Sequence, residues 1–437
     1  MGSIARTTAG HRPPELCVEL WTLIFDFSTY VSDIYEPEFY DYSERIGPLN
    51  VDPHCKPAFK QSLETRRFIP LVCKAWYKLS IRFLYRSLWI EGFTTLPSLI
   101  TTLSSSGLEK RDGDPTLGLY TERIDVVFPA SRAIDATELK GIEGLSNLTK
   151  CLPNLSAVVF AACRPTITHF DLPHEVIDAM YNLGARLKII DWRNCHMRVS
   201  VSQVQGLFSS APNLRHFSCY TFVSADSAAR HPLPMMSSLS TFSYRHFKGQ
   251  LNLDPMSMPA LRHLVVESSR APLPVWHGFL EAYGHQVRSV YFSLSSEEKF
   301  QEEIDRIGAS CPNLERLTLC VNTGHHLPRH LHLPPVHVLG LRFDVNTAVD
   351  AVWDYLWGVL SDVCEQTPSI RTVQFVAFPF GQLGQQVARG KERFPHLPIE
   401  NHWDMAIKCG RLMRGVESGV DFASIGANLI FGVIGSS

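Results

Sequence analysis

The chain has 437 residues, which at about 150 residues per domain corresponds to roughly three structural units. Hydrophobic residues make up 45% of it and charged residues 19%, a balance typical of folded globular proteins and too apolar for general disorder. The 41 Lys and Arg against 43 Asp and Glu give a formal net charge of -2, which argues against a protein that coats a polyanion. We therefore expect no nucleic acid among its partners.

Amphipathic helices are predicted near the N-terminal end. One opens at the Pro13-Pro14 pair, because proline suits the first turn of a helix. A second helix begins at Pro70 and a third spans 81–86, followed by a strand at 88–90. The apolar residues of the first helix are Leu16, Val18, Leu20, Trp21, Leu23, Ile24, Phe25 and Phe27. They exceed what so small a module can bury, so the excess packs either on the rest of this chain or on a partner protein.

Several segments of this region resemble the F-box, particularly that of fungal F-box proteins. They are residues 13–16 (PPEL), 24–25 (IF), 71–76 (LVCKAW) and 84–88 (LYRSL), and the resemblance covers about residues 12–90. It implies a three-helix module that docks on a Skp-type adaptor and through it joins a cullin–RING ubiquitin ligase. The implied adaptor-binding or module-core positions are Pro13, Pro14, Leu16, Ile24, Phe25, Leu71, Val72, Cys73 and Trp76. The sequence does not separate the two roles.

Two features depart from the F-box pattern. Arg12 stands where the family usually has leucine. The connection between the first and second predicted helices is also long, from about residue 31 to 64, and it contains prolines and an acidic, tyrosine-rich tract. We interpret it as a mobile insertion, because structureless connections of this length are uncommon inside a compact module.

A short apolar phrase, Leu-x-x-Leu-x-Leu with substitutions, recurs nine times beyond residue 150. Most of its intervals lie near the roughly 20–29 residues of a leucine-rich repeat, in which each unit is a strand plus a helix or turn. Helical patterns at 300–307 and 348–366 lie between phrases. The first positions of the phrases are Leu155, Leu187, Leu214, Leu239, Leu261, Val287, Leu314, Val336 and Ile370.

These patterns predict an α/β fold. An N-terminal three-helix F-box is followed by a curved, leucine-rich-repeat-like α/β solenoid with a parallel sheet. An earlier strand is expected within 120–128. The predicted parts are a disordered N-terminus at 1–11, the helical module at 12–90, a connecting region with a first irregular repeat at 91–150, the solenoid at 151–378, and a C-terminal cap and tail at 379–437.

Basic residues recur directly after the first apolar position of a phrase. Equivalent positions of a parallel solenoid lie side by side, so these residues form a ladder along one edge of the sheet. The ladder either solvates the strand edge or binds an acidic or phosphorylated segment of a protein substrate through guanidinium contacts. The candidate substrate-binding residues are Lys188, Arg215, Arg262, Arg288 and Arg371, with Arg316 one position further along.

Signals of catalysis, cofactor binding and export are missing. We find no nucleophile elbow, no His-Glu-x-x-His and no phosphate-binding loop. A histidine-rich tract at 325–337 carries prolines that indicate a surface loop rather than a metal site. Eleven scattered cysteines without a Cys-x-x-Cys pair indicate reduced thiols, and the first residues lack the apolar core of a secretory signal. We expect no cofactor, no metal, no catalytic residue and no membrane partner, and a location in the cytoplasm, the nucleus or both.

The function that these patterns favour is that of a substrate-receptor subunit of a Skp–cullin–F-box ubiquitin ligase. The F-box would dock on the adaptor and the solenoid would bind a protein substrate. The alternative is a non-catalytic protein-binding scaffold, or a ligand sensor, unrelated to ubiquitin transfer.

Overall fold

A computed structural model of the chain describes residues between 16 and 401, with gaps. The described ranges are 16–30, 55–91, 93–104, 116–128, 136–162, 170–171, 174–194, 197–223, 232–248, 252–267, 274–293, 299–321, 327–328, 331–343, 350–376, 391–393 and 399–401. The predictions for residues 1–11, for 31–54 and for most of 379–437 fall outside these ranges.

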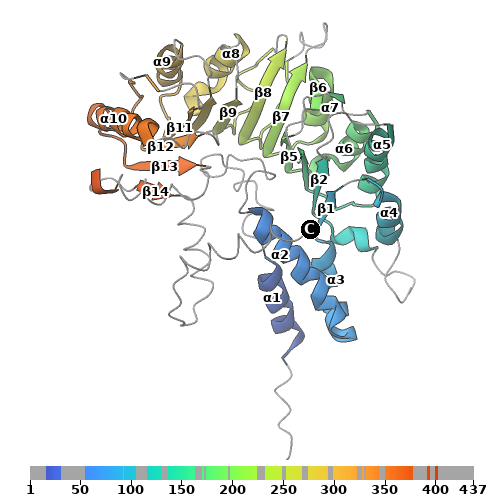
Figure 1. The fold of residues 1–437 in the computed structure, drawn as a ribbon. Helices are drawn as coiled ribbons and strands as arrows, with labels where there is room; N and C mark the ends of the chain where they lie inside the picture. Colours follow the sequence, from blue (N-terminus) through green and yellow to red (C-terminus); the bar gives the residue numbers. More distant parts are fainter. Residues whose placement is uncertain are drawn as a thin grey trace, which may run out of the picture.

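In the described ranges, fourteen strands form one open sheet, and each pair of neighbours runs parallel (Figure 1). Neighbours follow the order of the chain, except that β4 and β6 pair beside β7. The strands are β1 Ser87–Glu91, β2 Arg123–Phe128, β3 Ala157–Ala162, β4 Phe170–Asp171, β5 Ile189–Asn194, β6 Met197–Ser200, β7 His216–Val223, β8 Thr241–Lys248, β9 His263–Glu267, β10 Ser289–Ser293, β11 Arg316–Val321, β12 Val338–Phe343, β13 Thr372–Val376 and β14 Ile399–Asn401.

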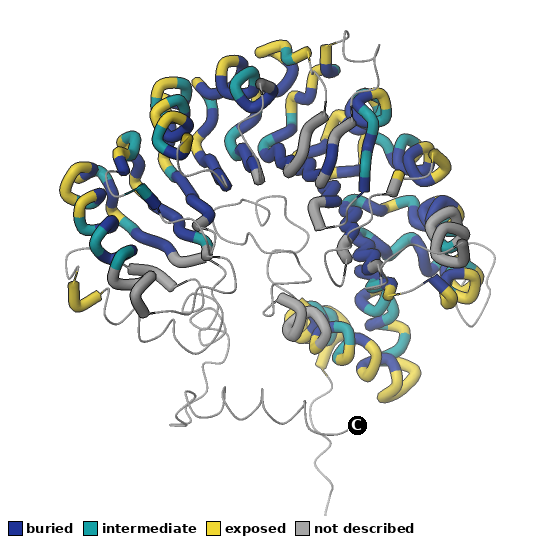
Figure 2. Tube along the Cα trace, turned by 45° about the horizontal axis from the view of Figure 1, so that its top comes forward, coloured by how far each residue is buried: buried dark blue, intermediate teal, exposed yellow. Residues whose placement is uncertain are grey.

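Helices cover the outer side of this curved sheet. In Figure 2 the buried strands form the inner layer of an arch, and the helices outside them present their exposed sides outward. The outer helices are α4 Leu96–Ser104, α5 Ala136–Lys150, α6 His174–Leu183, α7 Val201–Ser210, α8 Pro274–Tyr283, α9 Phe300–Ser310 and α10 Asp350–Gln366, and short 3₁₀ turns include η3 Leu117–Tyr120, η4 Gly184–Arg186 and η6 Gly284–Gln286. Parallel strands need crossover connections, and the helices of the described connections lie on one face of the sheet.

The register of the sheet follows the repeated apolar phrase. The second apolar position of every phrase lies opposite that of the next, and β1 and β2 continue the row at the start of the sheet. The row is Leu88, Ile124, Val158, Ile190, Phe217, Phe242, Leu264, Val290, Leu317, Leu339 and Val373. The predicted α/β class and parallel sheet are confirmed. The assignment to leucine-rich repeats stays a prediction.

The core lies between the sheet and the outer helices. Rings from successive strands pack on one another: the ring centroids of Phe160 and Trp192 are 6.1 Å apart, and those of Phe217 and Phe242 are 5.9 Å apart. All four side chains are buried. Each buried side chain of this size contributes about 1.5–3 kcal/mol of hydrophobic stabilisation. Because these rings bridge neighbouring units, each unit depends on the next for its burial.

The boundaries of the predicted parts change in the structure. The sheet begins with β1 and β2, before the predicted start of the solenoid at residue 151. The strand expected within 120–128 is confirmed as β2, which pairs with β3 in the region predicted to hold a first irregular repeat. At the other end, β14 extends the sheet beyond residue 378. Among the described residues, no helix has the length and apolar character that crossing a membrane requires.

The N-terminal helices also differ from the prediction. The helical module consists of α1 Val18–Thr29, α2 Cys55–Phe68, the 3₁₀ turn η2 Ile69–Leu71 and α3 Lys74–Tyr85. The predicted insertion at 31–64 is therefore wrong for its last ten residues, which are helical. The predicted helices from Pro70 and at 81–86 are one helix, because Leu79-Ser80-Ile81 contains no residue that would break it.

Candidate protein-binding surfaces

The helical module has a small aromatic core of its own. Phe25 is 1% exposed and packs with Ile69 and Phe83, and Trp21 and Trp76 close this cluster from the side. The ring centroids of Phe25 and Trp76 are 4.9 Å apart. Aromatic pairs at such distances add roughly 0.5–1.5 kcal/mol to the effect of their burial. The cluster therefore fixes α1 against α3.

A buried arginine joins the module to the sheet. The Arg66 guanidinium, from α2, donates to the Thr29 carbonyl oxygen at 2.9 Å and to the Ser87 hydroxyl at the start of β1. Ser62 of the same helix donates to the same carbonyl oxygen at 2.5 Å. The last carbonyl groups of a helix have no partner within it, so these bonds satisfy the end of α1 and tie it to α2 and β1.

The outer side of the module is apolar and exposed. The module lies beside β1, at one end of the sheet, away from the other helices (Figure 1). Of the twelve large hydrophobic residues exposed in the described part of the chain, ten lie on this module. We call them the apolar module surface: Leu16, Val18, Leu20, Leu23, Ile24, Phe27, Tyr30, Phe68, Leu71 and Val72. Exposed large hydrophobic residues gathered in one part of a structure are typical of protein-interaction sites.

The structure separates exposed positions from core positions among the predicted adaptor-binding residues. Leu16, Ile24, Leu71 and Val72 are exposed, and Leu71 is 77% exposed. Phe25 and Trp76 pack in the core of the module. Cys73 is the N-cap of α3 and accepts a hydrogen bond from the Trp76 backbone N–H, which gives it a structural role. Pro13 and Pro14 lie outside the described residues.

The predicted ladder exists as a continuous row at the amino-terminal edge of the sheet. The carbonyl oxygen of each member accepts backbone N–H groups from the next member and from the residue after it. For example, the Lys188 carbonyl oxygen accepts from Arg215 at 2.9 Å and from His216 at 3.0 Å. We call this row the edge ladder: Arg86, Glu122, Ser156, Lys188, Arg215, Ser240, Arg262, Arg288, Glu315, His337 and Arg371. Arg316 lies outside it, in the adjacent row, at the start of β11.

Positive charge dominates the edge ladder. Six of its eleven members are basic and two are acidic, on a chain whose formal net charge is -2. Both carboxylates are already paired: Glu122 lies 3.1 Å from Arg86, and Glu315 lies 3.3 Å from Arg288. Exposed pairs of this kind contribute about 0–1 kcal/mol each, so they do little for stability. The row therefore has more basic than acidic members.

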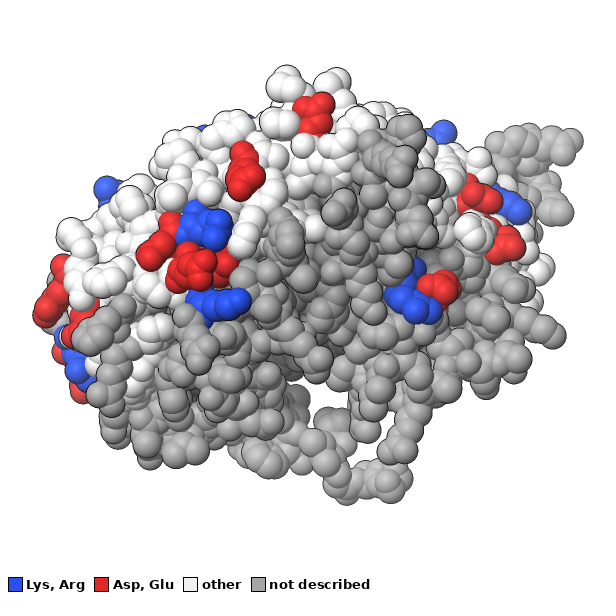
Figure 3. Space-filling model, turned by 90° about the horizontal axis from the view of Figure 1, so that it is seen from above, with Lys and Arg blue, Asp and Glu red and all other residues white. Residues whose placement is uncertain are grey.

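Another view of the molecule shows a different charge pattern. In Figure 3, seen from above, charges of both signs are spread over the described surface, and several Lys or Arg lie beside Asp or Glu. Paired charges of both signs cancel at a distance, whereas a row of one sign attracts a partner of the other. The edge ladder is therefore the better candidate for binding an anionic partner.

Sequence reasoning missed the first two members of the ladder. Arg86 and Glu122 stand at the same offset from β1 and β2 as Lys188 stands from β5. Their phrases were not recognised because Tyr85 and Thr121 occupy the place where the later phrases have an aliphatic residue. In the structure the Thr121 hydroxyl donates to the Tyr85 carbonyl oxygen at 2.8 Å, so a polar contact replaces the usual apolar one.

Cysteines and histidines of the described residues show no metal-binding cluster. No group of three or more potential metal ligands comes together in the described ranges. The predicted tract has only His332 and His337 within those ranges. Burial raises the pKa of the Cys311 thiol to about 12 and that of Cys364 to about 11, so both are neutral thiols at physiological pH. Neither is suited to metal binding or nucleophilic chemistry.

The comparisons with known proteins give no family assignment. No family model matches the chain, and no curated protein matches it.

Proposed function

We propose that the chain is a substrate-receptor subunit of a Skp–cullin–F-box ubiquitin ligase. The observation that carries the proposal is the apolar module surface, which contains ten of the twelve large hydrophobic residues exposed in the described ranges. Burial of such surface against a partner drives association, and protein interfaces have apolar cores of this kind. In this proposal α1, α2 and α3 are the F-box, and their exposed side binds a Skp-type adaptor.

The sheet region would bind the substrate. We assign it to the leucine-rich-repeat-like solenoids, in which stacked strand-and-turn units form an extended concave binding surface. The in-register apolar row from Leu88 to Val373 supports this assignment. The candidate substrate-binding residues are the basic members of the edge ladder, with Arg316 beside them.

The proposed mechanism is proximity. A receptor that holds a target lysine near a charged carrier converts an encounter between two molecules into an effectively intramolecular step. Such a subunit needs no catalytic residue, metal or cofactor of its own. A location in the cytoplasm, the nucleus or both accompanies this function.

Co-purification tests the proposal. The tagged full-length chain is expressed with a Skp-type adaptor and a cullin, and we expect all three to be recovered together. The double variant Leu23→Glu/Leu71→Glu should lose the adaptor, because burying a charge in an apolar interface is unfavourable. The matched control is Met235→Glu, since Met235 is 68% exposed but lies outside the module.

The outcomes separate the candidate functions. Retention of the adaptor by the folded double variant would contradict the docking assignment. Recovery of the adaptor without the cullin would favour the alternative, a binding scaffold unrelated to ubiquitin transfer.

A further inference from the structure

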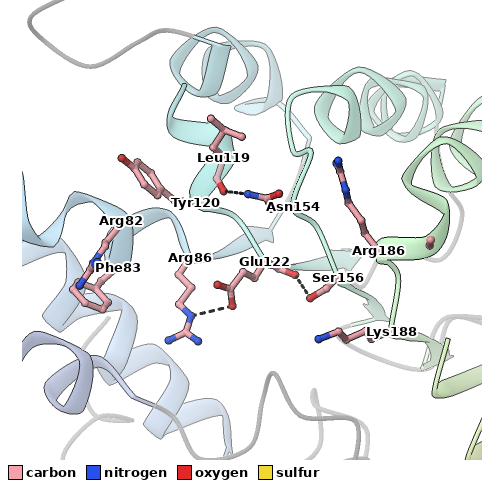
Figure 4. Close-up of a pocket in the computed structure, with 11 residues that line it drawn as sticks. Arg82, Phe83, Arg86, Leu119, Tyr120, Glu122, Asn154, Ser156, Arg186 and Lys188 are labelled. Atoms are coloured by element: carbon pink, nitrogen blue, oxygen red, sulfur yellow. Dashed lines mark hydrogen bonds and ion pairs between the residues drawn. The ribbon is translucent and has the colours of Figure 1, made fainter. Parts of the chain in front are cut away.

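A hollow of about 720 Å³ opens where the helical module meets the first strands. Its walls come from the end of α3, from η3 and η4, and from the first members of the edge ladder (Figure 4). We call it the junction groove. The lining residues that matter here are Arg82, Arg86, Glu122, Ser156, Arg186 and Lys188.

The junction groove contains four cationic side chains and one carboxylate. The carboxylate, Glu122, is paired with Arg86 at 3.1 Å, and Arg86 also pairs with Asp26 of α1 at 3.2 Å. Arg86 is therefore neutralised, and it holds α1 against the sheet. The positive charge available to a ligand comes from the other three cations.

Those three cations have no carboxylate partner among the described residues. Arg82 lies over the ring of Phe83, with its guanidinium carbon 4.7 Å from the ring centroid. Arg186 donates to the Pro153 carbonyl oxygen. The exposed Lys188 side chain points toward the side chains of Arg86 and Glu122 (Figure 4). All three are exposed, so an incoming anion can form charge-assisted hydrogen bonds with them at little cost in desolvation.

The groove continues into a row of further cations. Lys188 is both a lining residue and a member of the edge ladder, and the next member is Arg215, followed two strands later by Arg262. Neighbouring strands lie about 4.8 Å apart, so a chain that crosses the strand ends meets these cations one after another. A small anion could contact only one or two of these cations at a time. The arrangement fits an extended polypeptide segment with several negative charges.

We propose that the junction groove and the adjoining edge ladder bind an acidic segment of the substrate protein. This inference rests on the proposed function, because it names the substrate chemistry that the receptor would recognise. The recognised group is an oxyanion, which either Asp and Glu carboxylates or phosphorylated side chains can supply. A segment bound there lies beside the helical module, close to the adaptor that the module would hold.

Peptide binding to the full-length chain tests this inference. Three labelled peptides of equal length are compared by fluorescence anisotropy: one rich in Glu and Asp, one with phosphoserine, and one with Gln and Asn in their place. We expect the first, the second or both to bind, and the neutral peptide not to bind. Tighter binding of the phosphoserine peptide would identify phosphorylated side chains as the source of the oxyanion, and tighter binding of the acidic peptide would identify carboxylates.

Charge-reversal variants localise the binding. Lys188→Glu and Arg82→Glu should each weaken binding roughly tenfold or more, because each replaces an attraction by a repulsion. The matched control is Lys299→Glu, at the start of α9, which makes the same change in net charge and should leave the affinity within about twofold. Equal binding of the neutral peptide, unchanged binding by both groove variants, or an equal loss in the control would overturn the inference.

The adaptor gives an independent readout of the proposed function. Lys188→Glu should co-purify with the adaptor as the unmodified chain does, because Lys188 lies outside the apolar module surface. Loss of peptide binding by a chain that keeps the adaptor separates the groove from the module and supports the inference. If no acidic or phosphorylated peptide binds the adaptor-bound, unmodified chain, the inference fails and the proposed function stands.

Discussion

The indole rings of Trp21 and Trp76 lie with their centroids 4.7 Å apart and join the first turns of α1 and α3. Both rings also contact the cluster around Phe25. By contrast, the side chains of Leu20 in α1 and Leu71 in η2 are exposed. The module therefore has a closed aromatic cluster as well as exposed apolar side chains, and different substitutions can change each of them.

Stability and adaptor binding should respond to different residues of the module. Trp76→Ala opens a cavity beside Phe25 and should lower the free energy of unfolding of the module by about 3 kcal/mol. Leu71→Glu changes a residue that is 77% exposed and should alter it by less than about 0.5 kcal/mol. Urea denaturation followed by tryptophan fluorescence measures both. Equal destabilisation by the two variants would show that Leu71 is a core residue.

Asparagine side chains link successive units of the sheet. Asn154, Asn213 and Asn313 each follow a proline and precede the first apolar residue of a phrase. Their side-chain amides donate to the carbonyl oxygens of Leu119, Ala185 and His285, at 2.7, 2.7 and 2.6 Å. Each acceptor lies in the 3₁₀ turn of an earlier unit.

Removal of one such amide donor should loosen the contact between two units. Asn213→Asp keeps the size of the side chain but replaces the donor with an acceptor, and it should lower the free energy of unfolding by about 1 kcal/mol or slightly more. Asn147→Asp, on the exposed side of α5, is the control and should have little effect. The urea midpoint of each variant provides the comparison. A midpoint unchanged by Asn213→Asp would mean that the bond contributes nothing to unit stacking.

The sequence revealed those parts of the fold whose buried residues are apolar. The row through Val158, Ile190 and Phe217 consists of large hydrophobic residues at a regular spacing, so the strands and their parallel pairing could be predicted. The Pro-Asn-Leu triplets were also visible in the sequence. Their role was not, because a hydrogen bond to an earlier unit depends on how the units stack.

The helix α2 escaped prediction for the opposite reason. Among its described side chains, Ser62 and Arg66 are the buried ones, and polar residues do not produce the apolar stripe by which a helix is recognised. The junction groove was hidden in a similar way. Arg82 lies about a hundred residues from Arg186 and Lys188 in the sequence, and only the folded chain brings all three to one hollow.

A buried ion pair near the start of the sheet should be sensitive to loss of either partner. Arg123 donates to both carboxylate oxygens of Asp125, at 2.6 Å each, and both side chains are only 2% exposed. Asp125→Ala leaves a buried guanidinium without this partner and should cost roughly 3–5 kcal/mol. Thermal unfolding of the variant measures the loss.

The double variant Arg123→Met/Asp125→Leu tests the same pair by removing both charges together. Replacing both charges by apolar side chains of similar size removes the desolvation cost, so most of the lost stability should return. A double variant as unstable as Asp125→Ala would indicate that the pair holds the strand in place through its geometry. An Asp125→Ala variant as stable as the unmodified chain would contradict the prediction that loss of one partner is destabilising.

Alkaline pH should destabilise the protein through its buried thiols. Burial raises the pKa of Cys311 to about 12, so the folded state keeps a proton that the unfolded chain releases near its ordinary pKa of 9.0. Between those two values the unfolded state binds fewer protons. The free energy of unfolding therefore falls as pH rises, by about 1.4 kcal/mol per pH unit for each such thiol.

Cys311→Ala should remove the contribution of one thiol. The variant should be less stable below about pH 9 because it loses buried volume. Its free energy of unfolding should decline less steeply than that of the unmodified chain between pH values of about 9 and 11. Urea denaturation at several pH values in that range gives both slopes. Cys364, whose pKa is raised to about 11, provides a second variant with a smaller expected change. Identical slopes for the unmodified chain and Cys311→Ala would mean that the thiol at Cys311 ionises as readily in the folded state as in the unfolded chain.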